Sequence, residues 1–290
     1  MLHKIEFDLG GRTMIIETGK IAKQANGAVT VQYGDSMVVS TICAMPEIKP
    51  GFDFFPLTVE YREKSYSAGK IPGSFFRREG RPSEKETLSS RIIDRPIRPL
   101  FPEDFRGETQ CISFVISHDQ QNDTDMLALN GTSAAIAVSD VPFGKTIAGV
   151  RVGRIDGKFI VNPTFSQLEE SDLNVIVAGS ADSIIMVEGG GGEVSEGELI
   201  DAMSFAHENI RTIINEINKL QKLAGKKKFA YESYKVDETL TAKVTEMVKG
   251  KYDKLNKIAD KDTRREEKKN LEKEILEALK EEFPDKSSSI

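Results

Sequence analysis

Tryptophan is absent from the 290-residue sequence, and cysteine occurs only twice. Phenylalanine, present 15 times, therefore supplies most of the aromatic packing. Cys43 and Cys111 each lie in an apolar, strand-like run. We expect two buried thiols, as in a reducing cytoplasm, and no disulfide framework. No apolar run approaches the roughly 20 residues of a membrane-spanning helix, and the charged, alternating N-terminus does not resemble a signal peptide. These absences predict a cytoplasmic protein that does not enter a membrane.

Acidic residues outnumber basic ones, and the resulting net charge of -6 argues against a nucleic-acid-binding protein. The distribution of charge along the chain reverses that argument. Residues 62–106 hold 11 Lys and Arg against 7 Asp and Glu, and residues 219–290 hold 19 against 15. The rest of the chain holds 10 against 24. Because the rest of the chain is acidic, the two basic segments are the parts of the chain that we expect to contact an anionic partner.

The first two thirds of the sequence read as β-strands joined by turns. Asn26-Gly27 and Asp156-Gly157 are dipeptides favoured in hairpins, and Gly34 to Ser36 marks a further turn. An alanine-rich stretch predicts a helix over residues 124–139. The expected strands cover residues 13–17, 29–31, 37–43, 54–61, 111–116, 147–152, 158–161, 173–178 and 183–187.

A long amphipathic helix is predicted after Ser195. Ser195 and Glu198 form a capping box, in which each side chain satisfies a free backbone N–H at the helix start. Apolar residues then recur every three or four positions up to Leu220, and Gly225 ends the helix.

The last part of the chain has a different composition. Residues 229–290 are dense in Lys and Glu, with apolar residues at helical spacing, and predict a small all-helical domain. The sequence stops at residues 287–290 without a closing element, so we expect a fragment of a longer protein. The predicted fold class is α+β, with mixed or antiparallel sheets packed against helices, followed by this all-helical domain.

Residues 69–82 contain two adjacent phenylalanines and three arginines between glycines and prolines that mark a loop. Phe75 and Phe76 would be unfavourable on an exposed loop unless a partner covers them. Aromatic rings stack on unpaired bases, and guanidinium groups such as those of Arg77 and Arg78 pair with phosphates. The combination of adjacent aromatic rings and arginines predicts a binding site for single-stranded RNA. The alternative is a structural loop that buries both rings in the core.

A short helix continues the basic segment. Ser83 and Glu86 form a second capping box, and Pro96 is expected to stop the helix after Asp94. Because Pro96 closes it early, the helix would be only about three turns long.

Arginines on and after this helix extend the predicted RNA surface. Arg91 and Arg95 lie one turn apart and would repel one another, which favours phosphate groups between them; Arg98 follows between two prolines. Neutralisation of these arginines by Asp94 and Glu79, in an internal salt-bridge network, is the competing interpretation.

Other possible sites are weaker. Gly144-Lys145-Thr146 lacks the earlier glycine of a phosphate-binding P-loop. The acids Asp119, Asp123 and Asp125 lack the glycine and closing Glu of a calcium loop, and the three histidines form no zinc pattern. We expect the four glycines 189–192 to form a strand-to-helix connection.

Three segments resemble the polynucleotide phosphorylase family: residues 75–82, residues 91–102 and residues 123–135. The order of segments is similar over the whole chain. The resemblance implies that residues 1–220 form the family's first RNase PH-like domain, with a ribosomal protein S5 domain 2-like fold, and that residues 221–290 begin its helical linker domain. The family's second RNase PH-like domain, KH domain and S1 domain are not in this sequence.

The resemblance implies a homotrimeric ring in the cytoplasm that degrades mRNA processively from the 3′ end. Such an enzyme uses inorganic phosphate and Mg²⁺ to release nucleoside diphosphates. It also implies membership of an RNA degradosome, with an endoribonuclease scaffold and an RNA helicase. The residues expected to contact RNA are Phe75, Phe76, Arg77, Arg78, Arg81, Arg91, Arg95 and Arg98.

The same resemblance places catalysis outside this chain. In the family, the catalytic strand of the second RNase PH-like domain carries a metal-binding Asp, a Lys and an earlier Asp. Asn174, Ile176 and Leu168 stand at the matching positions here. The phosphate turn of the active copy matches Gly131-Thr132-Ser133, where hydroxyl groups survive. We therefore expect no catalytic residue and no metal ligand in this chain.

Two further hypotheses remain open. The chain is alternatively a non-catalytic RNA-binding subunit of an RNase PH-type ring, which the Asn174 and Ile176 replacements favour for the chain taken alone. A third, weaker hypothesis is that the fragment itself retains phosphorolysis.

Overall fold

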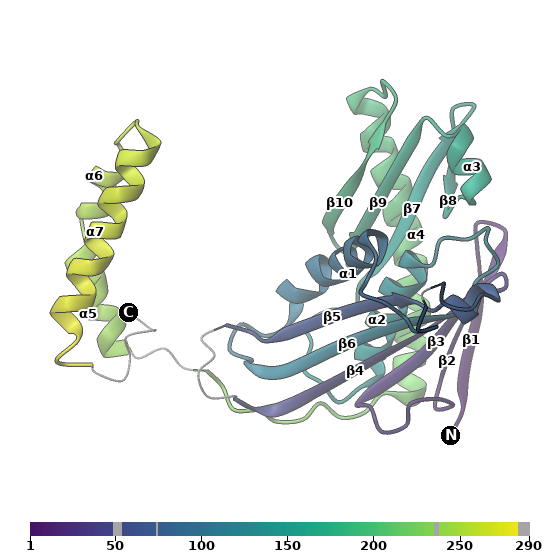
Figure 1. Cartoon of the computed structure of the whole chain (residues 1–290), viewed down its shortest axis with the longest axis horizontal. Helices are drawn as coiled ribbons and strands as arrows, with labels where there is room; N and C mark the ends of the chain where they lie inside the picture. Colours follow the sequence, from purple (N-terminus) through teal and green to yellow (C-terminus); the bar gives the residue numbers. More distant parts are fainter. Residues whose placement is uncertain (49–53, 74, 235–237, 284–290) are drawn as a thin grey trace.

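The computed structural model describes residues 1–48, 54–73, 75–234 and 238–283. It confirms the predicted α+β class: two sheets pack with helices around one hydrophobic core (Figure 1). The larger sheet has six strands in the order β1-β2-β3-β4-β6-β5. Its pairs are antiparallel except for β5 and β6, which are parallel. The strands are β1 (His3–Leu9), β2 (Arg12–Thr18), β3 (Gly27–Tyr33), β4 (Ser36–Ile48), β5 (Leu57–Glu63) and β6 (Gly107–Ser117).

The smaller sheet has four antiparallel strands in the order β10-β9-β7-β8. These are β7 (Ala148–Ile155), β8 (Lys158–Val161), β9 (Leu173–Gly179) and β10 (Ile184–Gly191). Asp156 and Gly157 connect β7 and β8, both with positive φ, as the sequence predicts for this hairpin.

Helix α2 (Asp125–Val138) lies at the centre of the core, and every one of its residues is buried. It contacts β3 and β4 of the larger sheet, β7 of the smaller one, and the long helix α4 (Glu196–Ala224). A Cβ at Gly131 would come within 2.6 Å of Ser40 Oγ, so glycine is required where α2 crosses β4. The apolar residues of α4 recur at helical spacing and form one buried stripe along the helix. This stripe explains why α4 packs beside α2.

Helix α1 (Glu84–Ile97) corrects one prediction, because it does not stop before Pro96. Pro96 lacks an N–H for the intrahelical ladder. Ile93, Pro96 and Ile97 are nevertheless all buried under the helix, and this packing outweighs the loss of one hydrogen bond. The chain then passes directly into a short 3₁₀ segment, η2 (Arg98–Leu100).

Three smaller expectations also change. Cys43 is exposed, because it lies on the outer face of β4, whereas Cys111 is buried as predicted. The β2–β3 connection is a longer loop over residues 19–26 instead of a tight Asn-Gly turn. Gly189 to Gly191, expected in a strand-to-helix connection, instead belong to β10, and the short helix α3 (Phe165–Glu170) and the 3₁₀ helix η1 (Ser65–Ala68) had no counterpart in the sequence prediction.

A second, separate hydrophobic cluster forms in the C-terminal helices. These are α5 (Glu238–Val248), α6 (Lys251–Leu255) and α7 (Lys261–Leu279), and their buried residues are Leu240, Leu271, Ile275 and Leu279. The proposed division after residue 220 stays a prediction, and α4 continues through it to Ala224. Residues 284–290 lie outside the described ranges. Within those ranges, no helix combines the length and apolarity needed to cross a bilayer.

Candidate nucleic-acid interface

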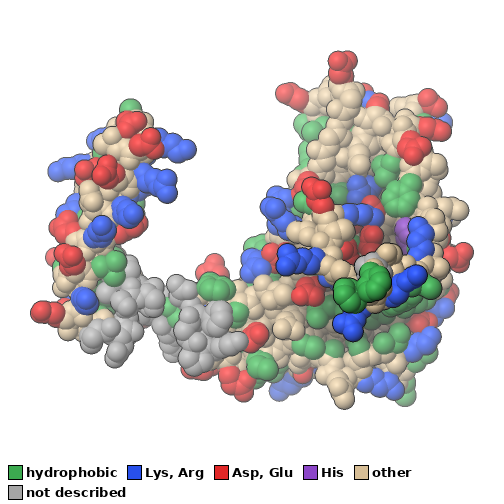
Figure 2. All heavy atoms as spheres, in the orientation of Figure 1, with side chains coloured by type: hydrophobic (Ala, Val, Ile, Leu, Met, Phe, Trp, Pro, Cys, Tyr) green, Lys and Arg blue, Asp and Glu red, His purple; other side chains and the backbone are tan. Residues whose placement is uncertain are grey.

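Phe75 and Phe76 project from the surface. Their side chains are 94% and 75% exposed, and their rings meet edge to face with centroids 5.4 Å apart. The alternative that the core buries them is therefore wrong. Arg77, directly after them, has a left-handed backbone with φ of 53°, a conformation uncommon for a residue with a side chain. Figure 2 shows hydrophobic side chains bordered by Lys and Arg on this face of the α+β domain.

Two polar anchors hold the base of this loop. Arg62 of β5 donates a hydrogen bond from Nη2 to the carbonyl of Gly80, at 2.9 Å. The Glu79 carboxylate accepts from the backbone N–H of Ser65 at 2.9 Å, at the start of η1. Glu79 therefore positions the loop, and no arginine contact of its carboxylate is found among the described residues. This removes Glu79 from the predicted salt-bridge network.

The N-terminus of α1 is fixed to β5 by one carboxylate. Glu86 and Ser83 form the predicted capping box, and Glu86 Oε1 also accepts the N–H of Glu63 at 2.8 Å. Burial alone would raise the pKa of Glu86. The backbone donors and nearby Arg62 outweigh burial and hold the pKa of Glu86 below its usual value.

The arginines of α1 and of the η2 segment that follows it divide into free and engaged side chains. Arg91 is exposed and, within the described part of the chain, makes no hydrogen bond or ion pair. Arg95 pairs with Glu188 of β10 at 2.5 Å. Arg98 binds the Asp94 carboxylate at 2.8 Å and donates to the carbonyl of Leu57 at 3.0 Å. The competing salt-bridge interpretation is thus correct for the Asp94–Arg98 pair, and contact of these arginines with RNA stays a prediction.

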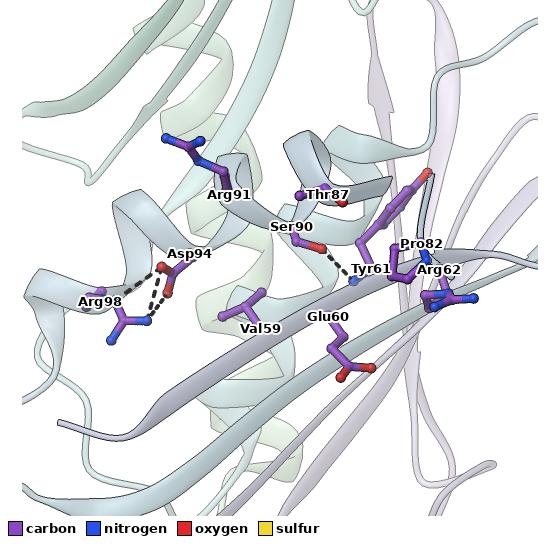
Figure 3. Close-up of a pocket in the computed structure, with 10 residues that line it drawn as sticks. All are labelled: Val59, Glu60, Tyr61, Arg62, Pro82, Thr87, Ser90, Arg91, Asp94 and Arg98. Carbon is purple, nitrogen blue, oxygen red and sulfur yellow. Dashed lines mark hydrogen bonds and ion pairs between the residues drawn. The ribbon is translucent and has the colours of Figure 1, made fainter. Parts of the chain in front are cut away.

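A cavity of about 480 Å³ opens between β5 and α1 (Figure 3). Arg91, Ser90 and Asp94 line it from α1, and Val59 lines it from β5. Pro82, which follows the loop of Phe75 and Phe76 in the sequence, also lines it. The cavity wall also includes the acid Glu60, so it carries charges of both signs, and a continuous RNA-binding surface over residues 75–98 stays a prediction.

The strand expected to lack catalytic groups is β9, and its exposed polar residue Asn174 is engaged by an arginine of the neighbouring strand β7. Asn174 Oδ1 accepts a hydrogen bond from Arg151 at 2.7 Å. The other terminal nitrogen of Arg151 lies 2.5 Å from Asp125 Oδ2 and 3.2 Å from Asp123 Oδ2. A guanidinium cation thus occupies the space between the three oxygen-bearing side chains, so these residues do not fit Mg²⁺, which requires free oxygen ligands. Ile176 is buried and offers no ligand.

Burial dominates the electrostatics of this cluster. Asp125 is 3% exposed at its side chain, and its burial beside Asp123 raises the pKa of Asp125 to about 6, although Arg151 opposes the shift. Lys85 lies 3.3 Å from Asp123 and 2.8 Å from Glu63. Sequence reasoning treated these acids only as a failed calcium loop and missed Arg151. The available signal was Arg151 itself, which lies between Val150 and Val152 in the predicted strand.

The hydroxyl groups of Thr132 and Ser133 are not available to phosphate. Both residues are buried inside α2. Ser133 Oγ donates to the carbonyl of Ile147 at 2.6 Å, and Thr132 Oγ1 donates to the carbonyl of Ala128 at 2.8 Å. Hydroxyl groups are retained at these two positions, as the sequence comparison predicted. In this fold, however, they bind backbone carbonyls inside the core.

Comparison with known proteins agrees with this architecture. Residues 10–142 match the 3′ exoribonuclease family, domain 1, and residues 145–209 match the 3′ exoribonuclease family, domain 2. The chain is 49% identical over 287 residues to a polyribonucleotide nucleotidyltransferase of Desulfatibacillum aliphaticivorans, covering 99% of this chain and 40% of that relative. It is 49% identical over 288 residues to the protein of that name from Geobacter sulfurreducens, covering 99% and 41%.

A third relative of the same name, from Anaeromyxobacter dehalogenans, is 50% identical over 275 residues, which cover 94% of this chain and 38% of the relative. The chain therefore spans about two fifths of the length of the curated relatives it matches. The two family matches confirm the predicted RNase PH-like fold.

Proposed function

Because the chain belongs to the 3′ exoribonuclease family, we propose that it supplies RNA binding to a processive phosphorolytic enzyme that degrades mRNA from the 3′ end. The observation that carries this proposal is the pair of exposed rings of Phe75 and Phe76 beside Arg77 and Arg78, on a loop that is anchored at Glu79 and Gly80. Rings held in this way stack on unpaired bases without distinguishing their sequence. Neighbouring guanidinium groups bind the phosphates that connect those bases.

The RNA path then continues along α1. Arg81 and Arg91 offer guanidinium groups that are free within the described ranges, and Arg95 and Arg98 extend the basic surface from their ion pairs with Glu188 and Asp94. Since phosphate contacts position a nucleic acid without reading its sequence, this surface suits an enzyme that moves along many different RNAs.

Phosphorolysis belongs to another part of the full-length protein in this proposal. The three-oxygen cluster at β9 is already neutralised by Arg151, and Ile176 replaces the expected Lys. Mg²⁺ and inorganic phosphate would therefore act outside this chain, and the isolated chain would be inactive. In the same proposal the full-length enzyme forms a homotrimeric ring in the cytoplasm and joins an RNA degradosome.

Replacing Arg77 and Arg78 together with alanine tests the proposal. In the full-length enzyme, we expect weaker RNA binding and lower processivity with an unchanged fold. The slope of log affinity against log salt should become shallower by about 0.7 for each phosphate of a single strand that the variant no longer neutralises. A matched control replaces Lys158 and Lys145, which lie outside the loop. Equal affinities at several salt concentrations would contradict the proposal.

The second candidate function is a non-catalytic RNA-binding subunit of an RNase PH-type ring. The hydrogen bond between Arg151 and Asn174 favours the non-catalytic subunit for this chain taken alone. The match to about two fifths of the length of longer relatives favours a part of a phosphorolytic enzyme. Whether the native gene continues past residue 290 distinguishes the two.

A further inference from the structure

Strand β5 forms one edge of the six-stranded sheet, since among the described residues it pairs with β6 alone. Edge strands carry a row of backbone N–H and C=O groups that no neighbouring strand satisfies. In a strand, the N–H and C=O of one residue point to the same side, and successive residues alternate. The residues that face away from β6 can therefore be identified from their other partners.

Side chains of α1 and of η2 bind three of these outward-facing positions. The N–H of Tyr61 donates to Ser90 Oγ at 3.0 Å, and the N–H of Glu63 donates to Glu86 Oε1 at 2.8 Å. The carbonyl of Leu57 accepts from Arg98 at 3.0 Å. Odd-numbered residues of β5 therefore turn their backbone groups toward α1.

Val59 lies between these positions and is the exception. By the same alternation its N–H and C=O face α1, yet in the described ranges no side chain binds either group. Val59 also lines the cavity of about 480 Å³ (Figure 3). The cavity thus presents one backbone donor and one backbone acceptor, side by side, at a residue of this edge where neither group is bound within the described residues.

The remaining walls fit a nucleotide. Arg91 lines the cavity and makes no hydrogen bond or ion pair within the described residues, and Pro82, which follows the loop of Phe75 and Phe76 in the sequence, lines it as well. The volume lies within the range of small-ligand sites, about 300–1,000 Å³. A peptide strand is a poorer occupant, because strand addition needs several consecutive free edge groups, and side chains of α1 already bind the N–H groups of Tyr61 and Glu63.

We propose that this cavity holds one unstacked nucleobase of the bound RNA, which is hydrogen-bonded by the N–H and C=O of Val59 while Arg91 binds the adjoining phosphate. Bases carry neighbouring donors and acceptors on their Watson–Crick edges, which single-stranded RNA leaves free. This inference rests on the proposed RNA-binding function and adds a base-binding position to it.

Adenosine 5′-monophosphate and ribose 5-phosphate, titrated separately into the ¹⁵N-labelled chain, test the role of the base. AMP should bind at least about tenfold more tightly, and the amide resonance of Val59 should shift with AMP but not with ribose 5-phosphate. Equal binding of the two probes, or an unmoved Val59 amide in the wild-type chain, would overturn the inference.

Val59→Pro removes the outward N–H without touching the ladder to β6, because an edge strand tolerates proline at such a position. It should weaken AMP binding about tenfold, whereas the control Val59→Thr, which keeps the N–H, should stay within about twofold. Arg91→Ala should weaken both probes alike. If Val59→Pro does not fold, the wild-type Val59 resonance still decides the question.

A 12-nucleotide single-stranded RNA separates this inference from the proposed function. RNA binding without any response of Val59 to AMP would refute the base pocket and leave the proposed function intact. AMP binding that depends on Val59, with no RNA binding, would support the pocket and refute the proposed function.

Discussion

Replacing Arg151 with methionine is expected to destabilise the α+β domain by about 3–5 kcal/mol at pH 8, the usual cost of removing one partner from a buried ion pair. Arg151 is 12% exposed at its side chain and contacts Asp123 and Asp125, which are 14% and 3% exposed. Methionine fills a similar volume but leaves two buried carboxylates side by side. Lys85, 3.3 Å from Asp123, remains as partial compensation, so the lower end of the range applies if it moves closer.

The loss should depend on pH, and its sign follows from Asp125. Burial and Asp123 raise the pKa of Asp125 in the folded protein to about 6, above the value of about 3.9 in an unfolded chain. The folded state therefore binds more protons between these values, and the contribution of Asp125 to stability falls as pH rises through this window. Without Arg151 the pKa rises further, so the variant should lose less stability at pH 5 than at pH 8.

Hydrogen exchange of the buried amides of α2, measured in urea at both pH values, reports the stability of this domain. Lys145→Met is the matched control, because Lys145 and Asp182 form an exposed pair of a kind that contributes about 0–1 kcal/mol. A loss below about 1 kcal/mol at pH 8, or an equal loss at both pH values, would refute the argument that Arg151 neutralises a buried acidic cluster.

Two further predictions concern the chain in solution. The isolated chain should release no nucleoside diphosphates from poly(A) in the presence of phosphate and Mg²⁺, since Arg151 occupies the oxygen cluster at β9; phosphate-dependent release, measured by chromatography, would show that this copy is active. The mass of the isolated chain, measured by light scattering, should approach that of a trimer when single-stranded RNA is added. A monomeric mass at all RNA concentrations would show that ring assembly needs other parts of the protein.

Local signals in the sequence predicted most of the fold. The capping boxes that begin at Ser83 and Ser195, and the hairpin at Asp156, form as expected because each depends on residues a few positions apart. The end of α1 was mispredicted because tertiary packing of Ile97 and its neighbours outweighs the local effect of Pro96. Exposure of Phe75 was also correctly anticipated.

Contacts between distant segments could not be read from the sequence. Arg98 binds the carbonyl of Leu57, 41 positions away, and Arg151 binds Asp123, 28 positions away. Neither spacing follows a helical or strand period, so each pair exists only because the sheets and α1 bring the two residues together. The open edge at Val59 likewise depends on where α1 lies along β5.

The most direct test of the central claim compares two proteins, the wild-type chain and a variant with both Phe75 and Phe76 replaced by alanine. The measurement is the affinity of each for a 12-nucleotide single-stranded RNA. Each stacked base typically contributes roughly 1–3 kcal/mol, and both rings are exposed and available for stacking. We predict at least a tenfold loss of affinity, about 1.4 kcal/mol or more, with an unchanged circular dichroism spectrum. Equal affinity of the two proteins would contradict the claim that this loop grips RNA.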